Sequence, residues 1–354
     1  MADWPMFHRD PQRTGYTPDE ALSPELLRWV LQTQDAVFFA SPTVKGARCF
    51  CGSRDGYLYS VNAESGELIW SFHTSDEGNL ANSAADSQVF AGSNRDGCLR
   101  ALSADRGELL WIFQTLGPVF SSPLEVENTV VIGSSDGSLY GLDRTSGARL
   151  WEYRCGGEVR YSSCLAGRAV CAGSTNGVLY AVDLEDGRPL WNFRTQGAVN
   201  CTPSSAEGLV LCGSDDQNLY AVESDSGKLV WQFRTDGPIR STCALAAGRI
   251  ILTSMDGRCY ALDAEGGRQL WSYRTNDSVY SSPAVSAEKV LFGSGDGHLY
   301  GLELDSGRLQ WRNFIGSGII SSPAVAGGRI YVGAENGRLY CFGGSGKNKR
   351  KKKQ

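Results

Sequence analysis

The chain has 354 residues, of which 41% are hydrophobic and 21% charged, and its formal net charge is −5. A chain of this length and composition forms either two ordinary domains or one large, closed all-β structure. Its 43 glycines fit many tight turns, and its 3 methionines fit few long helices. No stretch approaches the ~18 consecutive apolar residues of a transmembrane helix, which excludes a helical membrane protein.

The N-terminal segment, Met1 to Asp10, has neither the basic start nor the apolar run of a secretory signal. This absence predicts a soluble, cytoplasmic protein, which we expect to be a monomer. The eleven cysteines fit that compartment as buried, reduced thiols, because most of them lie within apolar strand-like runs. No zinc site is predicted, because the three histidines, His8, His73 and His298, belong to different repeats.

Tryptophan recurs along the chain with a period of 40 or 41 residues, and only Trp4 stands outside the series. The eight members are Trp29, Trp70, Trp111, Trp151, Trp191, Trp231, Trp271 and Trp311. A strict period of this length identifies a repeat architecture. Residues that all eight copies share are therefore expected to belong to the scaffold.

The repeat unit is clearest between residues 279 and 314, where turn signals separate four short strands. A Ser-Ser-Pro step opens the innermost strand. Residues 290–294, 298–302 and 308–314 form the other three, the last containing the periodic tryptophan.

The second and third strands are joined by Asp296-Gly297, a hairpin signal because such a turn needs positive φ values. Asp-Gly or Asn-Gly recurs at this place in the other repeats, except the fifth, which has Asp216-Gln217. The turn explains the acidic residues, so no metal site is predicted there.

Eight such units in a ring predict an all-β fold, an eight-bladed β-propeller of four-stranded antiparallel blades. The first Trp strand, residues 27–31, precedes the first inner strand, whereas the last unit, residues 320–342, has no Trp strand. The N-terminal strand is therefore predicted to complete the last blade and close the ring. The expected domains are a lead-in (1–26), a single propeller (27–342) and a flexible basic tail (343–354).

The C-terminal tail concentrates positive charge in Lys347, Lys349, Arg350, Lys351, Lys352 and Lys353. Removing these six charges from the net −5 leaves the rest of the chain at −11. A tail of this kind would contact an acidic partner, nucleic acid or anionic lipid only weakly. We favour the alternative, a solvated terminus without a specific ligand.

The repeat pattern G-S-x-D-G-x-L-Y-x-L-D-x-x-x-G-x-x-L-W is well formed at residues 133–151 and 173–191, and Asp never follows the periodic Trp as it does in WD-type blades. The pattern resembles the pyrroloquinoline-quinone (PQQ) repeat of quinoprotein dehydrogenases and of the Bam-complex propeller lipoprotein. Residues 3–16 are similar to the lead-in of many such proteins, so the resemblance covers residues 3–342. Each periodic Trp is then expected to pack between adjacent blades, with its indole N–H hydrogen bonded.

The resemblance extends to enzymes that hold PQQ and calcium at one mouth of the channel, using an Asp base, Glu and Asn ligands and often an adjacent Cys-Cys disulfide. Those features lie in long loops that this shorter chain lacks, and it has no adjacent Cys pair. We therefore expect no catalysis, no catalytic residue and no cofactor, as in a BamB-like propeller. PQQ with calcium is the alternative.

The repeats differ at the residue two positions before the second Ser or Thr of each inner-strand opening. These residues are Phe39, Ala81, Phe120, Tyr161, Asn200, Arg240, Tyr280 and Ile320. By analogy with the fold they rim the central channel, where the four aromatic rings would stack on a planar anion, Arg240 would bind its carboxylate and Asn200 would orient it. The alternative is that they fill the narrow end of the channel or face solvent.

The function that this pattern favours is a rigid, non-catalytic scaffold whose faces and blade edges bind another protein or a peptide. The alternative is a small-ligand or quinone-binding protein, or a dehydrogenase-like quinoprotein, that uses the channel mouth.

Overall fold

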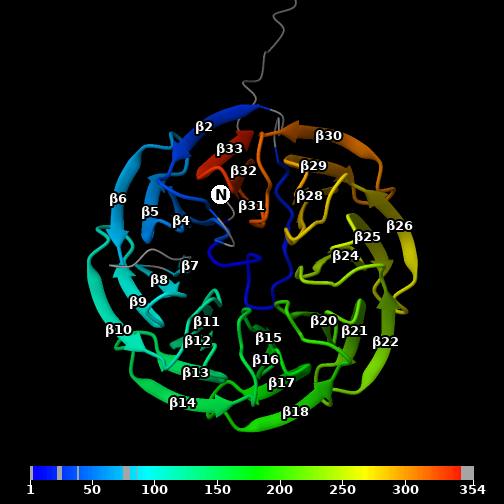
Figure 1. Cartoon of the computed structure of the whole chain (residues 1–354), viewed down its shortest axis with the longest axis horizontal. Helices are drawn as coiled ribbons and strands as arrows, with labels where there is room; N and C mark the ends of the chain where they lie inside the picture. Colours follow the sequence, from blue (N-terminus) through cyan, green and yellow to red (C-terminus); the bar gives the residue numbers. More distant parts are fainter. Residues whose placement is uncertain (1–2, 22–25, 38–39, 75–79, 86, 344–354) are drawn as a thin grey trace, which may run out of the picture.

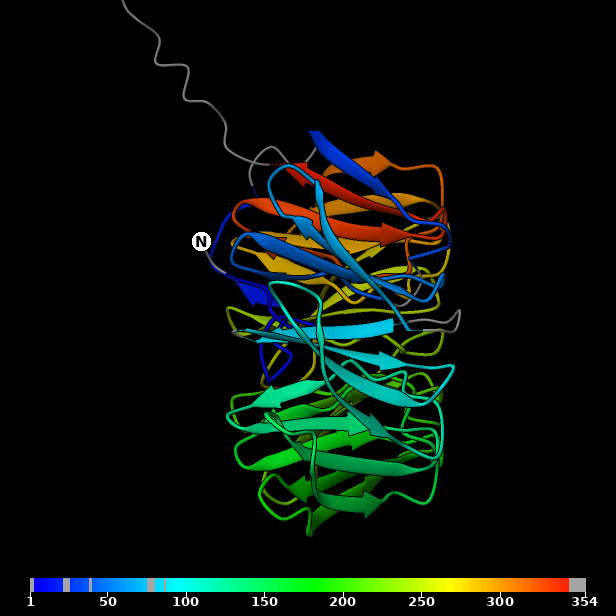
Figure 2. The same ribbon diagram turned by 90° about the vertical axis from the view of Figure 1, so that its left-hand side faces the viewer.

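The computed structural model describes residues 3–21, 26–37, 40–74, 80–85 and 87–343. Within these ranges the chain forms 33 strands in eight sheets and no helix, hence none that could cross a membrane. The sheets stand around a central axis as the blades of a propeller (Figure 1), and the edge-on view shows a disc (Figure 2). The predicted all-β, eight-bladed fold is confirmed.

In each blade, the strand named first lies nearest the central axis and the strand named last lies at the circumference. Blades 1 to 4 are β3 (Thr43–Lys45), β4 (Arg48–Gly52), β5 (Tyr57–Asn62) and β6 (Leu68–His73); β7 (Leu80–Ala85), β8 (Gln88–Ser93), β9 (Cys98–Ser103) and β10 (Leu109–Gln114); β11 (Leu124–Val126), β12 (Thr129–Gly133), β13 (Ser138–Asp143) and β14 (Arg149–Arg154); β15 (Cys164–Ala166), β16 (Ala169–Gly173), β17 (Val178–Asp183) and β18 (Pro189–Arg194). Blades 5 to 8 are β19 (Ser204–Ala206), β20 (Leu209–Gly213), β21 (Asn218–Glu223) and β22 (Leu229–Arg234); β23 (Ala244–Ala246), β24 (Arg249–Thr253), β25 (Arg258–Asp263) and β26 (Gln269–Arg274); β27 (Ala284–Ser286), β28 (Lys289–Gly293), β29 (His298–Glu303) and β30 (Leu309–Phe314); β31 (Ala324–Ala326), β32 (Arg329–Ala334), β33 (Arg338–Gly343) and β2 (Leu27–Gln32). The short β1 (Tyr16–Thr17) adds to blade 7 in parallel with β27.

The N-terminal strand closes the ring as the position of the first Trp predicted. Strand β2 pairs antiparallel with β33, so that Leu27 lies opposite Phe342 and Trp29 opposite Cys341. In Figure 1 the blue β2 forms the outer edge of the blade that contains the red β33. Because β2 is the outer strand of blade 8, one sheet contains residues from both ends of the repeat array.

Burial within a blade follows the position of each strand. In blade 7 the middle positions of β28 and β29 are buried on both faces, because neighbouring blades pack on each side. The outer β30 is exposed at most positions. The inner strand begins at Ala284, one residue beyond the predicted opening step, since Pro283 has no N–H to donate to a ladder.

The aspartate of the hairpin turn is a structural residue. The carboxylate of Asp296 accepts hydrogen bonds from the Tyr300 hydroxyl at 2.7 Å, from the His298 amide at 3.0 Å and from the amide of Asn276 in the preceding blade at 3.1 Å. Burial raises the pKa of Asp296, but these bonds outweigh it and hold the pKa below its usual range. Without glycine, the fifth repeat places Gln217 itself at φ 75°.

The periodic tryptophans lie between blades. Seven of them donate from Nε1 to a backbone carbonyl of the next blade at 2.7–3.3 Å, as Trp271 does to Leu304 at 2.9 Å. Each of these seven rings also covers a glycine with positive φ in the next blade, such as Gly307 beneath Trp271. Trp311 has no acceptor among the described residues.

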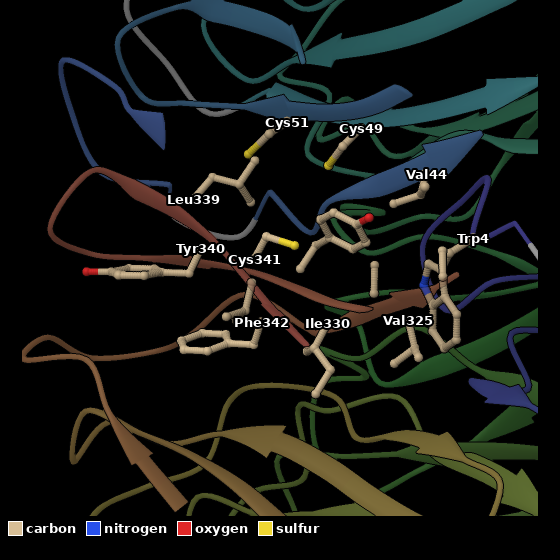
Figure 3. Close-up of a cluster of buried hydrophobic side chains, with 14 of the residues drawn as sticks. Trp4, Val44, Cys49, Cys51, Val325, Ile330, Leu339, Tyr340, Cys341 and Phe342 are labelled. Atoms are coloured by element: carbon tan, nitrogen blue, oxygen red, sulfur yellow. The ribbon is translucent and has the colours of Figure 1, made fainter. Parts of the chain in front are cut away.

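The cysteines are part of the hydrophobic core. All eleven are buried and free. Between blades 8 and 1, Cys49 and Cys51 on β4 face Cys341 on β33 in a cluster that also contains Trp4 (Figure 3). Burial is the main cause that raises the pKa of Cys49 and Cys51, so these thiols remain protonated and pack as small apolar groups.

Candidate functional site

The lead-in crosses the central axis, as the dark blue segment in Figure 1 shows, and its Phe7 lines the central cavity. Trp4 exchanges both backbone hydrogen bonds with Val44 of blade 1, at 2.7 and 2.8 Å. Further along, five carbonyls of the lead-in each accept a hydrogen bond of 2.7–2.8 Å from a backbone amide on the inner strand of another blade. The donor occupies the equivalent position in each of these strands. These pairs are Pro5 with Ala84, Pro11 with Leu165, Gln12 with Ser205, Thr14 with Leu245 and Gly15 with Val285. The lead-in therefore ties six blades together at the axis.

Arg13 extends this contact to blade 3. Its side chain is fully buried and donates from Nε to the Ser163 carbonyl at 3.0 Å and from Nη2 to the Pro123 carbonyl at 3.3 Å. A third bond, from Nη1, reaches the Phe7 carbonyl. Burial lowers the pKa of Arg13 to about 10, so the guanidinium stays charged at neutral pH and holds the lead-in in place.

His8 lies against the backbone of Arg13. Its side chain is buried, and Nδ1 lies 2.8 Å from the Arg13 carbonyl. Burial lowers the pKa of His8 to about 4, which keeps the imidazole neutral at pH 7. Gly15 lies against the ring with φ +61°, and a Cβ there would come within 2.4 Å of the His8 Cε1 atom.

Above the lead-in, the channel forms a cavity of about 270 Å³ whose lining includes Phe7. Several of the residues predicted to rim the channel line this cavity, namely Ala81, Phe120, Tyr161, Arg240, Tyr280 and Ile320. Asn200 contacts the Asp215 carboxylate at 2.8 Å and is not among the lining residues. Phe39 and the tail residues Lys347 to Lys353 lie outside the described residues.

The structure changes the register of two blades at the rim. The amide of Ser122 donates to the Ser162 hydroxyl at 2.8 Å, so these two serines are equivalent and Arg160 is the counterpart of Phe120. Tyr161 therefore takes the position of the buried Ser121, although its ring still lines the cavity. The 40-residue period of the repeats could have identified Arg160, because it lies 40 residues after Phe120.

Blade 2 is shifted as well. Ala84 occupies the same place on the lead-in as Leu165, both donating to one of its carbonyls at 2.7 Å. Counting back three residues from each makes Ala81 the counterpart of Ser162. Ala81 therefore belongs to the level below the rim, where the other described blades carry a hydroxyl.

Arg240 is already paired within the protein. Its guanidinium binds the carboxylate of Asp215 through Nε at 2.9 Å and Nη2 at 3.2 Å. Asp215, in the turn after β20, raises the pKa of Arg240, and burial raises that of the neighbouring Tyr161. The residues predicted to bind and orient a ligand carboxylate, Arg240 and Asn200, thus both contact Asp215, a residue that the rim pattern did not include.

Below the rim, a ring of hydroxyls surrounds the cavity. It contains Ser41, Ser122, Ser162, Thr202, Thr242, Ser282 and Ser322, all at least nine-tenths buried. Five of these hydroxyls accept a hydrogen bond at 2.8–3.1 Å from the amide of the ring residue in the preceding blade. We call this set the hydroxyl ring; Ala81 occupies the eighth place.

The cavity offers few ligands for a metal. A calcium ion bound with PQQ would need carboxylate or amide oxygens. No Asp or Glu is among the described cavity-lining residues, and the described chain has no group of three or more His, Cys, Asp or Glu placed to hold a metal. The available donors do not fit a calcium site of that kind.

Comparisons with known proteins agree with the repeat pattern. A family model described as the β-propeller of beta-alanine-activating enzyme matches residues 147–353, and the model of outer membrane protein assembly factor BamB matches residues 27–198. No curated protein is significantly similar in sequence.

Solved structures with this fold include proteins of different kinds. BamB from Moraxella catarrhalis is 19% identical, with a TM-score of 0.77 over 90% of this chain and 99% of that one. Quinohemoprotein alcohol dehydrogenase from Comamonas testosteroni is 15% identical, with a TM-score of 0.85 over 98% and 81%. The computationally designed protein Ika8 is 17% identical, with a TM-score of 0.79 over 91% and 99%. At such identities the likeness shows the fold alone. The match to residues 147–353 spans more than half of the sequence, and the chain therefore belongs to the family of PQQ-repeat β-propellers represented by the propeller of beta-alanine-activating enzyme.

Proposed function

We propose that this chain is a non-catalytic propeller scaffold that binds another protein through the outer strands of three consecutive blades. The observation that carries the proposal is an apolar arc formed by β2, β6 and β10, which lie next to one another on the circumference (Figure 1). Its side chains are 41–53% exposed. They are Leu27, Val30, Leu68, Ile69, Leu109, Leu110 and Ile112.

The remaining outer strands differ from this apolar arc in their cationic side chains. Strands β14, β18, β22, β26 and β30 each contain or adjoin two of them: Arg149 and Arg154, Arg188 and Arg194, Lys228 and Arg234, Arg268 and Arg274, Arg308 and Arg312. Charged side chains on an edge strand discourage pairing with another chain. At the equivalent place before β6 and β10 stand Glu67 and Glu108. Five edges thus carry two cations each, whereas the three strands of the arc contain a single Lys or Arg, Arg28.

The exposed strand edges and side chains of the apolar arc indicate which kind of segment would bind to it. Each outer strand lies at the end of its sheet, with no further strand paired to it in the described chain. An apolar, extended segment flanked by Lys or Arg would add to such an edge and face Glu67 or Glu108. The family match is compatible with this role, because its model describes the β-propeller of beta-alanine-activating enzyme. We therefore assign this chain to docking, with the chemistry performed by a partner.

A matched pair of variants tests the apolar arc. Leu110 and Val230 both precede a periodic Trp and are 50% and 47% exposed, but only Leu110 lies in the arc. A stoichiometric partner that co-purifies with wild type and with Val230→Lys, but not with Leu110→Lys, is the expected result. Equal recovery with both variants would contradict the proposal. The same experiment without residues 347–354 measures what the basic tail contributes.

A second candidate function is small-ligand binding in the channel cavity. It is favoured by the convergence of Phe120, Tyr161 and Tyr280 on one cavity of about 270 Å³. For PQQ itself we expect no binding, since no Asp or Glu that could hold its calcium ion is among the described lining residues. Titration of the purified protein with PQQ and calcium checks this, and calorimetric heat with a spectral shift would restore the quinone hypothesis.

A further inference from the structure

The hydroxyl ring has unused donors. The Oγ atoms of Ser41, Ser162, Ser282 and Ser322 and the Oγ1 atom of Thr202 each accept a backbone amide. In the described chain, none of the seven ring hydroxyls donates its own proton to a protein acceptor. Each of these hydroxyls therefore has a proton to donate to an acceptor inside the cavity that all seven side chains line.

The charges of the cavity-lining residues indicate which kind of ligand group the ring hydroxyls would bind. The amide bonds take up lone pairs on the ring oxygens and surround them with N–H dipoles, which disfavours a cation at this level. Two arginines, Arg160 and Arg240, and no carboxylate are among the described lining residues. Glu158 and Asp215, which pair with these arginines, are not among the lining residues. Convergent O–H donors with no lining carboxylate are complementary to an anion.

The side chains that line the cavity above the hydroxyl ring indicate what the rest of the ligand would be. Phe120, Tyr161 and Tyr280 line the upper cavity, whereas Phe7 and the lead-in close the opposite end of the channel. An anion therefore enters from the rim, and whatever is attached to it must lie among the aromatic side chains. Aromatic rings at the mouth favour a flat or apolar body over a fully hydrated ion.

We propose that the cavity binds a carboxylate attached to an aromatic body, with the carboxylate in the hydroxyl ring and the body between Phe120, Tyr161 and Tyr280. This inference rests on the second candidate function, ligand binding in the channel, and is independent of the apolar arc. The same chemistry is offered by a free aromatic acid and by a peptide that ends in an aromatic residue.

Titration calorimetry with two pairs of probes tests the ligand. The pairs are 4-hydroxyphenylacetate with its amide, and the peptide Gly-Gly-Tyr with its C-terminal amide. We expect a carboxylate to bind once per chain and its amide at least tenfold more weakly, since a hydrogen bond to a charged group contributes about a factor of ten or more. Preference for the small acid or for the peptide identifies the source. Equal binding of acid and amide would overturn the carboxylate site while leaving ligand binding in the cavity intact, and the absence of binding by all four probes would overturn both.

Two variants test the position of the carboxylate. Thr242→Val keeps the side-chain shape, and no backbone amide donates to the Thr242 hydroxyl in the described chain, so we expect about tenfold weaker binding with an unchanged melting temperature. Ala81→Ser adds the missing eighth hydroxyl and should tighten binding severalfold, a gain that a purely structural ring would not produce. Thr145→Val, on an exposed turn, is the control. Unchanged affinity in both ring variants would place the ligand elsewhere.

Discussion

The indole Nε1–H of Trp29 donates a hydrogen bond to the backbone carbonyl of Ala63 at 3.3 Å, and its ring covers Gly66. Trp29 belongs to the outer strand of blade 8, whereas Ala63 and Gly66 belong to blade 1. This contact is the closing member of a series in which seven of the eight periodic Trp residues attach one blade to the next by the same hydrogen bond. The junction between the chain's two ends is therefore built in the same way as the junctions inside it.

Removing the N-terminal strand should open the propeller. Deletion of residues 1–33 removes both β2 and the lead-in, which exposes the edge of β33 and the inner strands of six blades. We expect a severe loss of stability, measured as a lower melting temperature by circular dichroism. An unchanged melting temperature would refute closure by this strand.

The docking tryptophans should differ in their sensitivity to loss of the indole N–H. Trp271→Phe leaves the Leu304 carbonyl without its donor at 2.9 Å, so we expect the free energy of unfolding to fall by about 2 kcal/mol. Trp311→Phe removes an N–H that has no acceptor in the described chain and should cost about 1 kcal/mol less. Urea unfolding of the two variants makes the comparison, and equal losses would show that the hydrogen bond contributes little.

The glycine beneath each Trp should be intolerant of a side chain. Gly267 and Gly248 have nearly the same φ, 67° and 69°, but a Cβ on Gly267 would lie 2.4 Å from Trp231 Cε3, whereas a Cβ on Gly248 would meet nothing within 4 Å. Gly248→Ala should therefore cost only the backbone strain of about 1 kcal/mol. For Gly267→Ala we expect about 1–3 kcal/mol more from overpacking. Thermal unfolding of both variants measures the difference, and similar losses would argue against close packing of the ring.

His8 should make stability depend on pH. Burial lowers its pKa to about 4 in the folded state from the ordinary histidine pKa of 6.5, so the unfolded state binds the proton more readily. The stability that neutral His8 provides is present above pH 6.5 and is lost as the pH falls towards 4, by about 3 kcal/mol at most. Urea unfolding between pH 7 and pH 4 should show this slope in wild type and a shallower one in His8→Asn. Parallel profiles would mean that His8 does not titrate with unfolding.

The sequence by itself determined the number of blades and the way in which the ring closes. The periodic Trp and the glycine at the hairpin turn of every repeat but the fifth act locally, through hairpin geometry and contacts with the adjacent blade, so their spacing predicts the architecture. The same regularity predicted the cavity rim at Phe120, Arg240 and Tyr280, because equivalent positions of a closed ring face the same axis. In blade 4 the Ser-Ser pair lies one residue later in the repeat, at Ser162-Ser163 instead of the positions of Ser121-Ser122, so counting from it gave Tyr161 where the structure has Arg160.

Only the tertiary structure decided the properties that depend on contacts across the axis. Arg240 looked like a ligand for a carboxylate until Asp215, 25 residues earlier, was found against it. The serines looked like strand openings, yet they meet in one ring because eight inner strands converge. The lead-in has no periodic pattern from which its path could be read, and it seals the channel through backbone carbonyls, which every residue possesses, and through the buried charge of Arg13. A repeat therefore encodes its own blade, whereas the chemistry of the cavity arises from residues that become neighbours only when the ring is closed.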